Sequence, residues 1–235
     1  RGGAAEQAAR IAAQAGVRYS LENPYAYANS NLIGYLNILE GCRHNKVGHL
    51  LYASSSSVYG VSDAPEVTED HPLIPLTLYN KYKGFCEPLL FKHQSEDFVC
   101  VIIRPATPCG YAPRQRLDLS VNILTNHAVN NGRITVFGGD QLRPNLHVQD
   151  MCDLYKMLIE VESAKIAGEI FNCGFQNMSI MEIARIVKQV VQEEFPEMGE
   201  IDIVATSTDD IRSYHISSDK IQRELGFKPK LTIQN

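Results

Sequence analysis

The sequence predicts an α/β fold, and three observations carry that prediction. Two continuous apolar runs, residues 50–53 and 98–103, are typical of strands that are buried on both faces of a parallel sheet. Segments with apolar residues at helical spacing, such as residues 32–39, alternate with these runs. Loops rich in serine, proline or glycine separate the two kinds of segment. Such an alternation favours a layered structure around a parallel sheet.

In the first half of the chain, each expected element follows from a local pattern. The expected elements are a helix over residues 32–39, a strand over 50–53, a loop over 64–78, a helix over 79–93 and a strand over 98–103. Residues 29–31 offer capping side chains for the first of these helices. Four serines end the first strand, and Arg104-Pro105 ends the second. Pro88 is expected to kink or interrupt its helix.

The second half continues the alternation. The expected elements are helices over residues 117–129, 150–161 and 218–225, strands over 134–137, 169–173 and 201–204, and a helix that begins at the capping box of Ser179 and Glu182. Gly138-Gly139 predicts a turn, and Gly226 is expected to close the last helix. Asp150 is expected to cap the helix that it begins.

Composition excludes several classes of function. The chain has 235 residues, of which 44% are apolar, so a substantial core is expected. Its 27 acidic and 22 basic residues give a net charge of −5, which disfavours non-specific nucleic-acid binding. No run approaches eighteen apolar residues, so no membrane span is expected. The six cysteines lack CxxC spacing, which predicts reduced core cysteines in a cytoplasmic protein and no metal site.

A cluster of serines is the first candidate for chemistry. Ser54, Ser55, Ser56 and Ser57 directly follow the expected strand at residues 50–53. In open α/β sheets, ligands bind at the carboxyl ends of the strands, and four hydroxyls are an unusual concentration of donors and acceptors. The alternative is a loop whose hydroxyls satisfy nearby backbone groups. Position alone does not decide between the two interpretations.

Tyr79 and Lys83 are the second candidate, because residues four apart on a helix lie on the same face. An ammonium near a phenol favours the phenolate and so lowers the tyrosine pKa from about 10. A base that works near neutral pH needs a shift of roughly three units, or about 4 kcal/mol. One exposed ion pair contributes about 1 kcal/mol or less, so the pair needs burial near a bound cation.

Basic side chains form the third group of candidates. Arg143 follows the glycine turn and is suited to a bidentate grip on phosphate, although a surface salt bridge is the alternative. Arg116 belongs to a basic loop that is suited to face an anion. His147 and Asp150 resemble part of a metal site or of a catalytic triad. The simpler interpretation is that His147 lies at the edge of the core and that Asp150 caps the next helix.

Taken in order, these pieces resemble the extended short-chain dehydrogenase/reductase family, in particular its NAD-dependent nucleotide-sugar epimerases and dehydratases. The resembling segments are residues 12–18, 29–31, 54–60, 79–83, 104–107, 138–150 and 216–227. They follow the order and spacing of the family over nearly the whole chain. The resemblance implies a partial Rossmann domain, which is a doubly wound parallel sheet that binds NAD, and a smaller C-terminal lobe that binds a nucleoside-diphosphate sugar.

The resemblance also implies domain boundaries and residue roles. The dinucleotide-binding domain would comprise residues 1–107 and 146–174, and the substrate lobe residues 108–145 and 175–235. Tyr79 would be the general base, Lys83 would hold the nicotinamide ribose, and Ser55 would hydrogen-bond the reacting sugar oxygen. The NAD cleft would be lined by Ala12, Ala13, Asn31, Ser54, Tyr79, Lys83 and Pro105. The substrate would meet Ser56, Ser57, Thr107, Arg143 and Arg116.

Within this family the serine cluster discriminates between reactions. The 4,6-dehydratases resemble Thr-Asp-Glu at the places of Ser55, Ser56 and Ser57, because elimination needs an acid and a base. The carboxylates that elimination requires are absent from these places in this chain, which favours a 4-epimerase acting on a UDP sugar or a UDP uronate. The stretch 12–60 is most similar to UDP-glucuronate 4-epimerases, whereas residues 105–111 are similar to a broader epimerase/dehydratase branch. A dehydratase or oxidoreductase and a non-catalytic nucleotide-sugar-binding fragment stay open as alternatives.

Two departures from the family pattern concern the beginning of the chain. The glycine-rich turn that holds the pyrophosphate of NAD has no match in Arg1-Gly2-Gly3, and the acidic residue after the second strand is also missing. We therefore expect the chain to be N-terminally truncated, with its own binding of NAD in doubt. The resemblance also makes a homodimer compatible with the fold.

Overall fold

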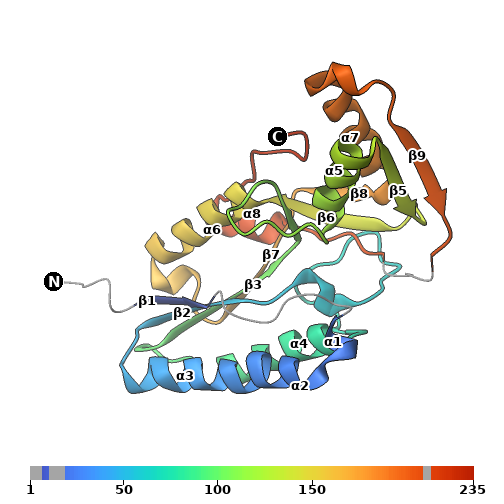
Figure 1. Cartoon of the computed structure of the whole chain (residues 1–235). Helices are drawn as coiled ribbons and strands as arrows, with labels where there is room; N and C mark the ends of the chain where they lie inside the picture. Colours follow the sequence, from blue (N-terminus) through green and yellow to red (C-terminus); the bar gives the residue numbers. More distant parts are fainter. Residues whose placement is uncertain (1–6, 11–18, 209–212) are drawn as a thin grey trace.

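The computed structural model describes residues 7–10, 19–208 and 213–235, and a four-stranded parallel sheet lies at its centre (Figure 1). The strand order is β1-β2-β3-β7, formed by Gln7–Arg10 (β1), His49–Ala53 (β2), Val99–Pro105 (β3) and Glu169–Cys173 (β7). The two apolar runs of the sequence lie in β2 and β3, the interior strands. This position explains why both runs are continuous, since each face of these strands is covered.

Helices cover both faces of the central sheet. Leu50 and Tyr52 of β2 pack in one core cluster with residues of Gly34–His44 (α3) and Leu78–Phe91 (α4). The intervening Leu51 packs in a second cluster with residues of Val148–Glu160 (α6) and Asp219–Leu225 (α8). Figure 1 shows α3 and α4 on one side of the sheet and α6 and α8 on the other. The predicted α/β class with a doubly wound parallel sheet is confirmed.

A smaller part of the molecule contains two further sheets. Thr107–Cys109 (β4) pairs in parallel with Leu142–His147 (β6), and β6 pairs in antiparallel with Gln176–Ser179 (β8). Arg133–Phe137 (β5) pairs in parallel with Asp202–Thr206 (β9). Two helices, Ser120–Asn131 (α5) and Ile180–Glu194 (α7), share a core cluster with β5. Strands β4, β6 and β8 are additions to the elements expected from the sequence.

Several short helices complete the described chain. They are Tyr19–Glu22 (α1), Pro24–Tyr27 (α2), the π-helix Ala28–Ile33 (η2), and the 3-10 helices Ser56–Tyr59 (η3), Ser163–Lys165 (η4) and Pro196–Met198 (η5). The helix that was expected over residues 32–39 is the end of η2 continued by α3. Across the described ranges, we find no helix with the length and apolar character needed to cross a bilayer.

The expectation that Asp150 caps helix α6 was wrong. His147, not Asp150, caps α6, because its Nδ1 accepts a hydrogen bond from the backbone N–H of Gln149 at 3.2 Å. The buried carboxylate of Asp150 instead accepts from the backbone N–H groups of Lys230 and Leu231. Asp150 therefore fixes the C-terminal segment on the start of α6. Its position in the first turn of the helix is also favourable for a negative charge.

Three smaller expectations were wrong as well. Pro88 does not interrupt α4, since this exposed proline lies between the buried Cys86 and Leu90, which hold the helix on the core through to Phe91. Helix α5 begins at Ser120 rather than at residue 117. Asn122 explains the later start, because its side chain donates to the carbonyl of Arg116 and keeps the preceding residues in a loop. All six cysteines are free, but one of them, on α6, is exposed rather than part of the core: Cys152.

Candidate active site

A cavity of about 780 Å³ lies at the carboxyl ends of β2 and β3. Its wall on the sheet side comes from the segment after β2, from the segment after β3 and from the start of α4. Its opposite wall comes from the smaller part of the molecule, including β5, β6 and the start of α7. Ligands bind at this edge in open α/β sheets, so the cavity is the candidate site that the topology itself selects.

Tyr79 and Lys83 both line this cavity from α4. Thr77 caps the helix immediately before them, and its hydroxyl accepts from the backbone N–H of Asn80. The Lys83 ammonium donates to the carbonyl of Ala53 at the end of β2, and it lies 6.0 Å from the centre of the Tyr79 ring. The helical spacing in the sequence therefore does bring the phenol and the ammonium to one wall of the cavity.

The surroundings of the Tyr79 phenol disfavour its ionisation. Burial raises the pKa of Tyr79 to about 12, and the positive charge of Arg116 opposes that increase. The neighbouring rings of Tyr27 and Tyr214 raise the same pKa further. A phenolate near neutral pH therefore needs an additional positive charge inside the cavity, and a bound oxidised nicotinamide carries one.

The serines after β2 also line the cavity, and hydrogen bonds connect them to α4. Ser55 caps the single-turn helix η3 by accepting from the backbone N–H of Ser57 at 3.2 Å. The hydroxyls of Ser55 and Ser57 lie 2.7 Å apart, and Ser57 donates to the Asn80 side-chain carbonyl at 2.8 Å. The hydroxyls therefore satisfy local groups, as one interpretation predicts, and they also line the cavity, while their action on a ligand stays a prediction.

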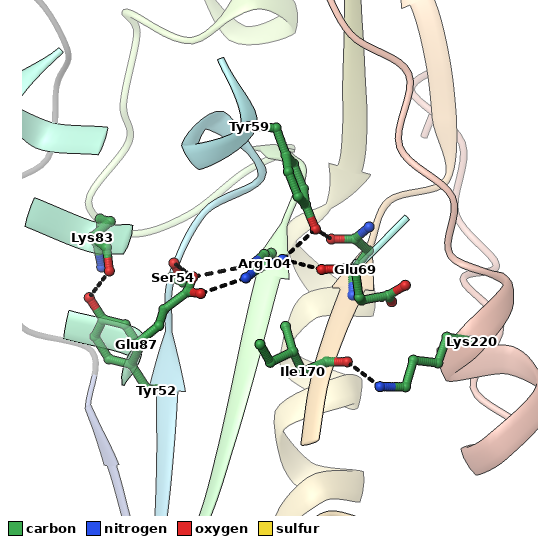
Figure 2. Close-up of polar contacts among 10 residues, drawn as sticks. Tyr52, Ser54, Tyr59, Glu69, Lys83, Glu87, Arg104, Ile170 and Lys220 are labelled. Atoms are coloured by element: carbon green, nitrogen blue, oxygen red, sulfur yellow. Dashed lines mark hydrogen bonds and ion pairs between the residues drawn. The ribbon is translucent and has the colours of Figure 1, made fainter. Parts of the chain in front are cut away.

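A buried network below the serines was not predicted from the sequence. Glu87 and Arg104 are each 3% exposed, and the guanidinium donates to both oxygens of the carboxylate at 3.1 and 2.6 Å (Figure 2). Glu87 also accepts from the Ser54 hydroxyl at 2.5 Å, and Arg104 donates to the Tyr59 hydroxyl at 2.8 Å. One signal was available, because Glu87 follows Lys83 by four residues and so lies on the same helical face.

The predicted substrate residues reach the cavity from several elements. Arg143 lines it from β6, and its guanidinium donates to the carbonyl of Leu142 at 2.9 Å. Arg116 lines it from the loop before α5 and forms a 2.6 Å ion pair with Asp118. The other predicted residues that line the cavity are Ser54, Ser56, Pro105 and Thr107. Side chains from four separated segments of sequence thus surround one space.

Among the described residues, Asn31 is the predicted cofactor residue that does not line the cavity. Asn31 is buried in η2, where its carbonyl accepts from the thiol of Cys86 at 3.5 Å. Ala12 and Ala13 lie outside the described residues. Other residues line the cavity without having been predicted, and the sequence pattern gave no reason to separate them from core positions: His127, Phe137, Tyr155 and Tyr214. Within the described ranges, no group of three or more potential metal-ligating side chains is present.

The sheet end of the cavity fits a flat ring. The strand ends Ala53 and Pro105, and the residues that follow them, Ser54 and Ala106, present small side chains to the cavity. Lys83 reaches the same edge, where its ammonium meets the carbonyl of Ala53. Small side chains leave space over the strand ends, and the nearby cation is suited to hold ribose hydroxyls. These residues therefore fit a nicotinamide and its ribose.

Comparison with known proteins decides the family. The model of the NAD dependent epimerase/dehydratase family matches residues 5–174, which is well over half of the chain. The chain belongs to this family. Protein CapI of Staphylococcus aureus is 30% identical over 98% of this chain and 73% of its own length. A probable UDP-glucuronate 4-epimerase of Rhizobium meliloti is 28% identical over 95% of this chain and 70% of its own length.

Solved structures show the same fold. UDP-glucuronic acid 4-epimerase from Bacillus cereus, in complex with UDP-glucuronic acid and NAD, matches with a TM-score of 0.81 and 24% identity, over 97% of this chain and 72% of the other. The dTDP-glucose 4,6-dehydratase DesIV from Streptomyces venezuelae matches with a TM-score of 0.80 and 21% identity, over 97% and 69%. The family assignment confirms the predicted resemblance, and NAD is the cofactor of this family. An epimerase and a dehydratase share the fold, so the fold alone does not separate the two reactions.

Proposed function

We propose that this protein is an NAD-dependent nucleotide-sugar 4-epimerase. The observation that carries the proposal is the uncharged hydrogen-bonded chain of Ser55, Ser57 and Asn80 beside Tyr79. Elimination of water from a sugar needs a carboxylic acid and a base at the reacting carbons. Hydroxyls and an amide in these places suit a reaction that only removes and returns a hydride and a proton.

The residues divide the work of proton transfer between them. NAD supplies the chemistry of accepting and returning the hydride. Tyr79, once ionised, takes the proton of the sugar 4-hydroxyl and later gives it back, and the charge of Lys83 stabilises the phenolate. Ser55 accepts the hydrogen bond of the 4-hydroxyl when the sugar binds, and that hydrogen turns to Tyr79 when the proton is transferred.

A UDP uronate is the substrate that we would test first, and a neutral UDP sugar is the second. Arg143 is suited to bind the diphosphate, because a guanidinium can donate two parallel hydrogen bonds to phosphate oxygens. Arg116 gives the cavity a second cation, which suits a sugar carboxylate beside Ser56, Ser57 and Thr107. The relative from Rhizobium meliloti, whose name includes UDP-glucuronate 4-epimerase, supports this choice.

The test is direct. The protein is incubated with NAD and with UDP-glucuronate or UDP-glucose, and the product sugars are separated after hydrolysis. A 4-epimerase gives the two C4 epimers in an equilibrium mixture, without net formation of NADH. The proposal would be overturned if the protein converts neither of these substrates and no other UDP sugar in a panel.

A dehydratase is the second candidate, and one observation favours it. Two carboxylates, Glu22 and Asp118, do line the cavity, although Asp118 is paired with Arg116. The structural similarity to DesIV is compatible with the same reaction. The two candidates give different products, since a dehydratase releases a 4-keto sugar that absorbs in alkali. Its formation in place of an epimer would select the dehydratase.

Three further features of the enzyme are part of the proposal. We place its dinucleotide-binding domain at residues 1–107 and 146–174 and its substrate lobe at 108–145 and 175–235. The free thiols support a reducing cytoplasmic location. A homodimer is proposed through the outer helical layer, where Ile33 and Phe85 are 53% and 59% exposed. Sedimentation should show a dimer that Phe85→Glu converts into a monomer; a monomeric wild type would contradict this.

A further inference from the structure

The chain of hydrogen bonds from Ser55 to Asn80 has a direction, and that direction follows from the chemistry of its last member. The side-chain carbonyl of Asn80 can only accept, so Ser57 is the donor in their 2.8 Å hydrogen bond. Ser57 has a single O–H, so its bond with Ser55 must use the hydrogen of Ser55. The hydrogen of Ser55 therefore points toward Ser57 and is not available to a ligand.

The remaining capacity of Ser55 is that of an acceptor. One lone pair of its oxygen accepts from the backbone N–H of Ser57 at 3.2 Å. A second lone pair is left for a ligand, because a hydroxyl oxygen has two. A hydroxyl in this state can accept a hydrogen bond from a sugar alcohol. It has no hydrogen left to donate to a sugar ketone.

This arrangement leaves one hydrogen-bond donor of the Asn80 side chain unused. The side chain is 1% exposed, and its Nδ2 has no hydrogen-bond partner within the part of the chain that the structure describes. An apolar side chain of the same shape would avoid the cost of that buried donor. Stability therefore does not explain why an amide occupies this position next to Tyr79. The explanation is the side-chain carbonyl of Asn80, which sets the direction of the serine hydrogens.

We propose that Asn80 is a positioning residue that keeps Ser55 an acceptor toward the reacting sugar oxygen. The proposal rests on the proposed 4-epimerase activity and deepens it. An epimerase must let the ketosugar turn before the hydride returns, and a ketone held by fewer donors turns more easily. With Ser55 acting as an acceptor, the hydroxyl of Tyr79 is the donor that is left to hold the ketone oxygen. Asn80 acts through Ser57 and Ser55, not on the sugar.

A double-mutant cycle tests this coupling. Asn80→Ala removes the acceptor, which allows Ser57 to donate to Ser55 and Ser55 to donate to the ketone. Ser57→Ala also frees the hydrogen of Ser55. Each change is expected to lower kcat about tenfold, the effect of one hydrogen bond that holds the ketone. Each should also raise the fraction of bound cofactor that is reduced during turnover. The double variant should be no worse than either single variant, because both changes break one chain.

Two further variants complete the design. Asn80→Asp keeps an acceptor and should keep a low fraction of reduced cofactor, although its charge next to Tyr79 shifts the pH profile to higher pH. Lys81→Ala changes the exposed neighbour on the same helix and should leave kcat and the reduced fraction as in the wild type. Additive losses for Asn80→Ala and Ser57→Ala, or an unchanged reduced fraction in both, would overturn the proposal.

A measurement without turnover separates this proposal from the proposed function. If the wild type converts no UDP sugar, the proposed function fails, and the direction of the chain can still be observed by NMR. The Ser57 hydroxyl proton of the ligand-free protein should be protected from exchange in the wild type and in Asn80→Asp. It should lose that protection in Asn80→Ala. A wild type without a protected Ser57 hydroxyl would refute the role of Asn80.

Discussion

The buried ion pair between Glu87 and Arg104 leads to a prediction about stability. Its shortest contact is 2.6 Å, and both side chains are almost fully buried. Removal of one partner from a buried pair costs about 3–5 kcal/mol, because the other charge keeps neither water nor a counter-ion. Glu87→Leu and Arg104→Met are each expected to lower the free energy of unfolding by that amount. Either loss is a large part of the roughly 5–15 kcal/mol that stabilises a typical domain.

The double variant shows whether the cost comes from the pair. Independent effects would add to about 6–10 kcal/mol. We expect the double variant to lose less than about 5 kcal/mol, because it leaves no charge unpaired. Its main remaining cost is the Glu69 carbonyl, which loses the Arg104 donor at 2.9 Å, for about 1–3 kcal/mol. The Tyr59 hydroxyl keeps its 2.7 Å bond to Asn172.

Urea unfolding followed by circular dichroism at neutral pH measures these differences. An exposed pair on α3 serves as the matched control, since Glu40 and Arg43 lie 2.7 Å apart with side chains 61% and 44% exposed. Glu40→Leu should cost about 1 kcal/mol or less. A double variant of Glu87 and Arg104 that loses the full sum of the single losses would refute the reasoning.

Three other predictions concern the cavity and the C-terminal segment. Burial raises the pKa of Tyr79 to about 12, so the contribution of the neutral phenol to stability is complete below about pH 10 and is lost as the pH rises toward 12. The tyrosinate absorbance of the wild type minus that of Tyr79→Phe should therefore titrate near pH 12. Arg116→Gln should move this titration to still higher pH, because the charge of Arg116 lowers the pKa of Tyr79. Arg143→Met should weaken UDP binding about 10- to 100-fold by calorimetry, whereas Arg223→Met, on the exposed face of α8, should not. Asp150→Ala should lower the free energy of unfolding by about 1–3 kcal/mol, because two backbone N–H groups lose their acceptor. An unchanged titration, equal UDP affinity or an unchanged unfolding midpoint would contradict the respective prediction.

The sequence predicts those parts of the site that depend on local spacing. Tyr79 and Lys83 are four residues apart on one helix, so their meeting follows from helical geometry. The serines follow a buried strand, so their place at the sheet edge follows from topology. The contact between Ser57 and Asn80 depends instead on how η3 packs against α4, and no pattern of neighbouring residues reports that packing.

The same limit explains the misassigned helix cap. An acidic residue at the start of a helix predicts a cap, and Asp150 has that position in the sequence. Its partners are backbone N–H groups eighty residues later, which a local pattern cannot reveal. The strands of the smaller part were missed for a related reason. Two polar residues of β6 break the apolar pattern. Arg143 is half-buried beside the cavity, and Asn145 is buried with its amide donating to the carbonyls of Arg143 and Gln176.

Two attachments fix helix α4 relative to strand β2. Lys83 binds the carbonyl of Ala53, and Glu87, one helical turn later, binds the hydroxyl of Ser54. The last residue of β2 and the residue after it are thus held by residues one turn apart on α4. A displacement of the helix by one turn would break both contacts. Tyr79, one turn before Lys83, is therefore held in the wall of the cavity that Ser55 also lines.

Arg104 makes this arrangement compatible with catalysis. A carboxylate four residues after a lysine on one helix face would ordinarily pair with its ammonium. Here the guanidinium of Arg104 binds both oxygens of Glu87, so the carboxylate is neutralised from the β3 side. The ammonium of Lys83 instead donates to the carbonyl of Ala53 and lies 6.0 Å from the centre of the Tyr79 ring. Arg104→Met should therefore raise the pKa of Tyr79 in addition to destabilising the fold, whereas Glu87→Leu/Arg104→Met should destabilise without that rise.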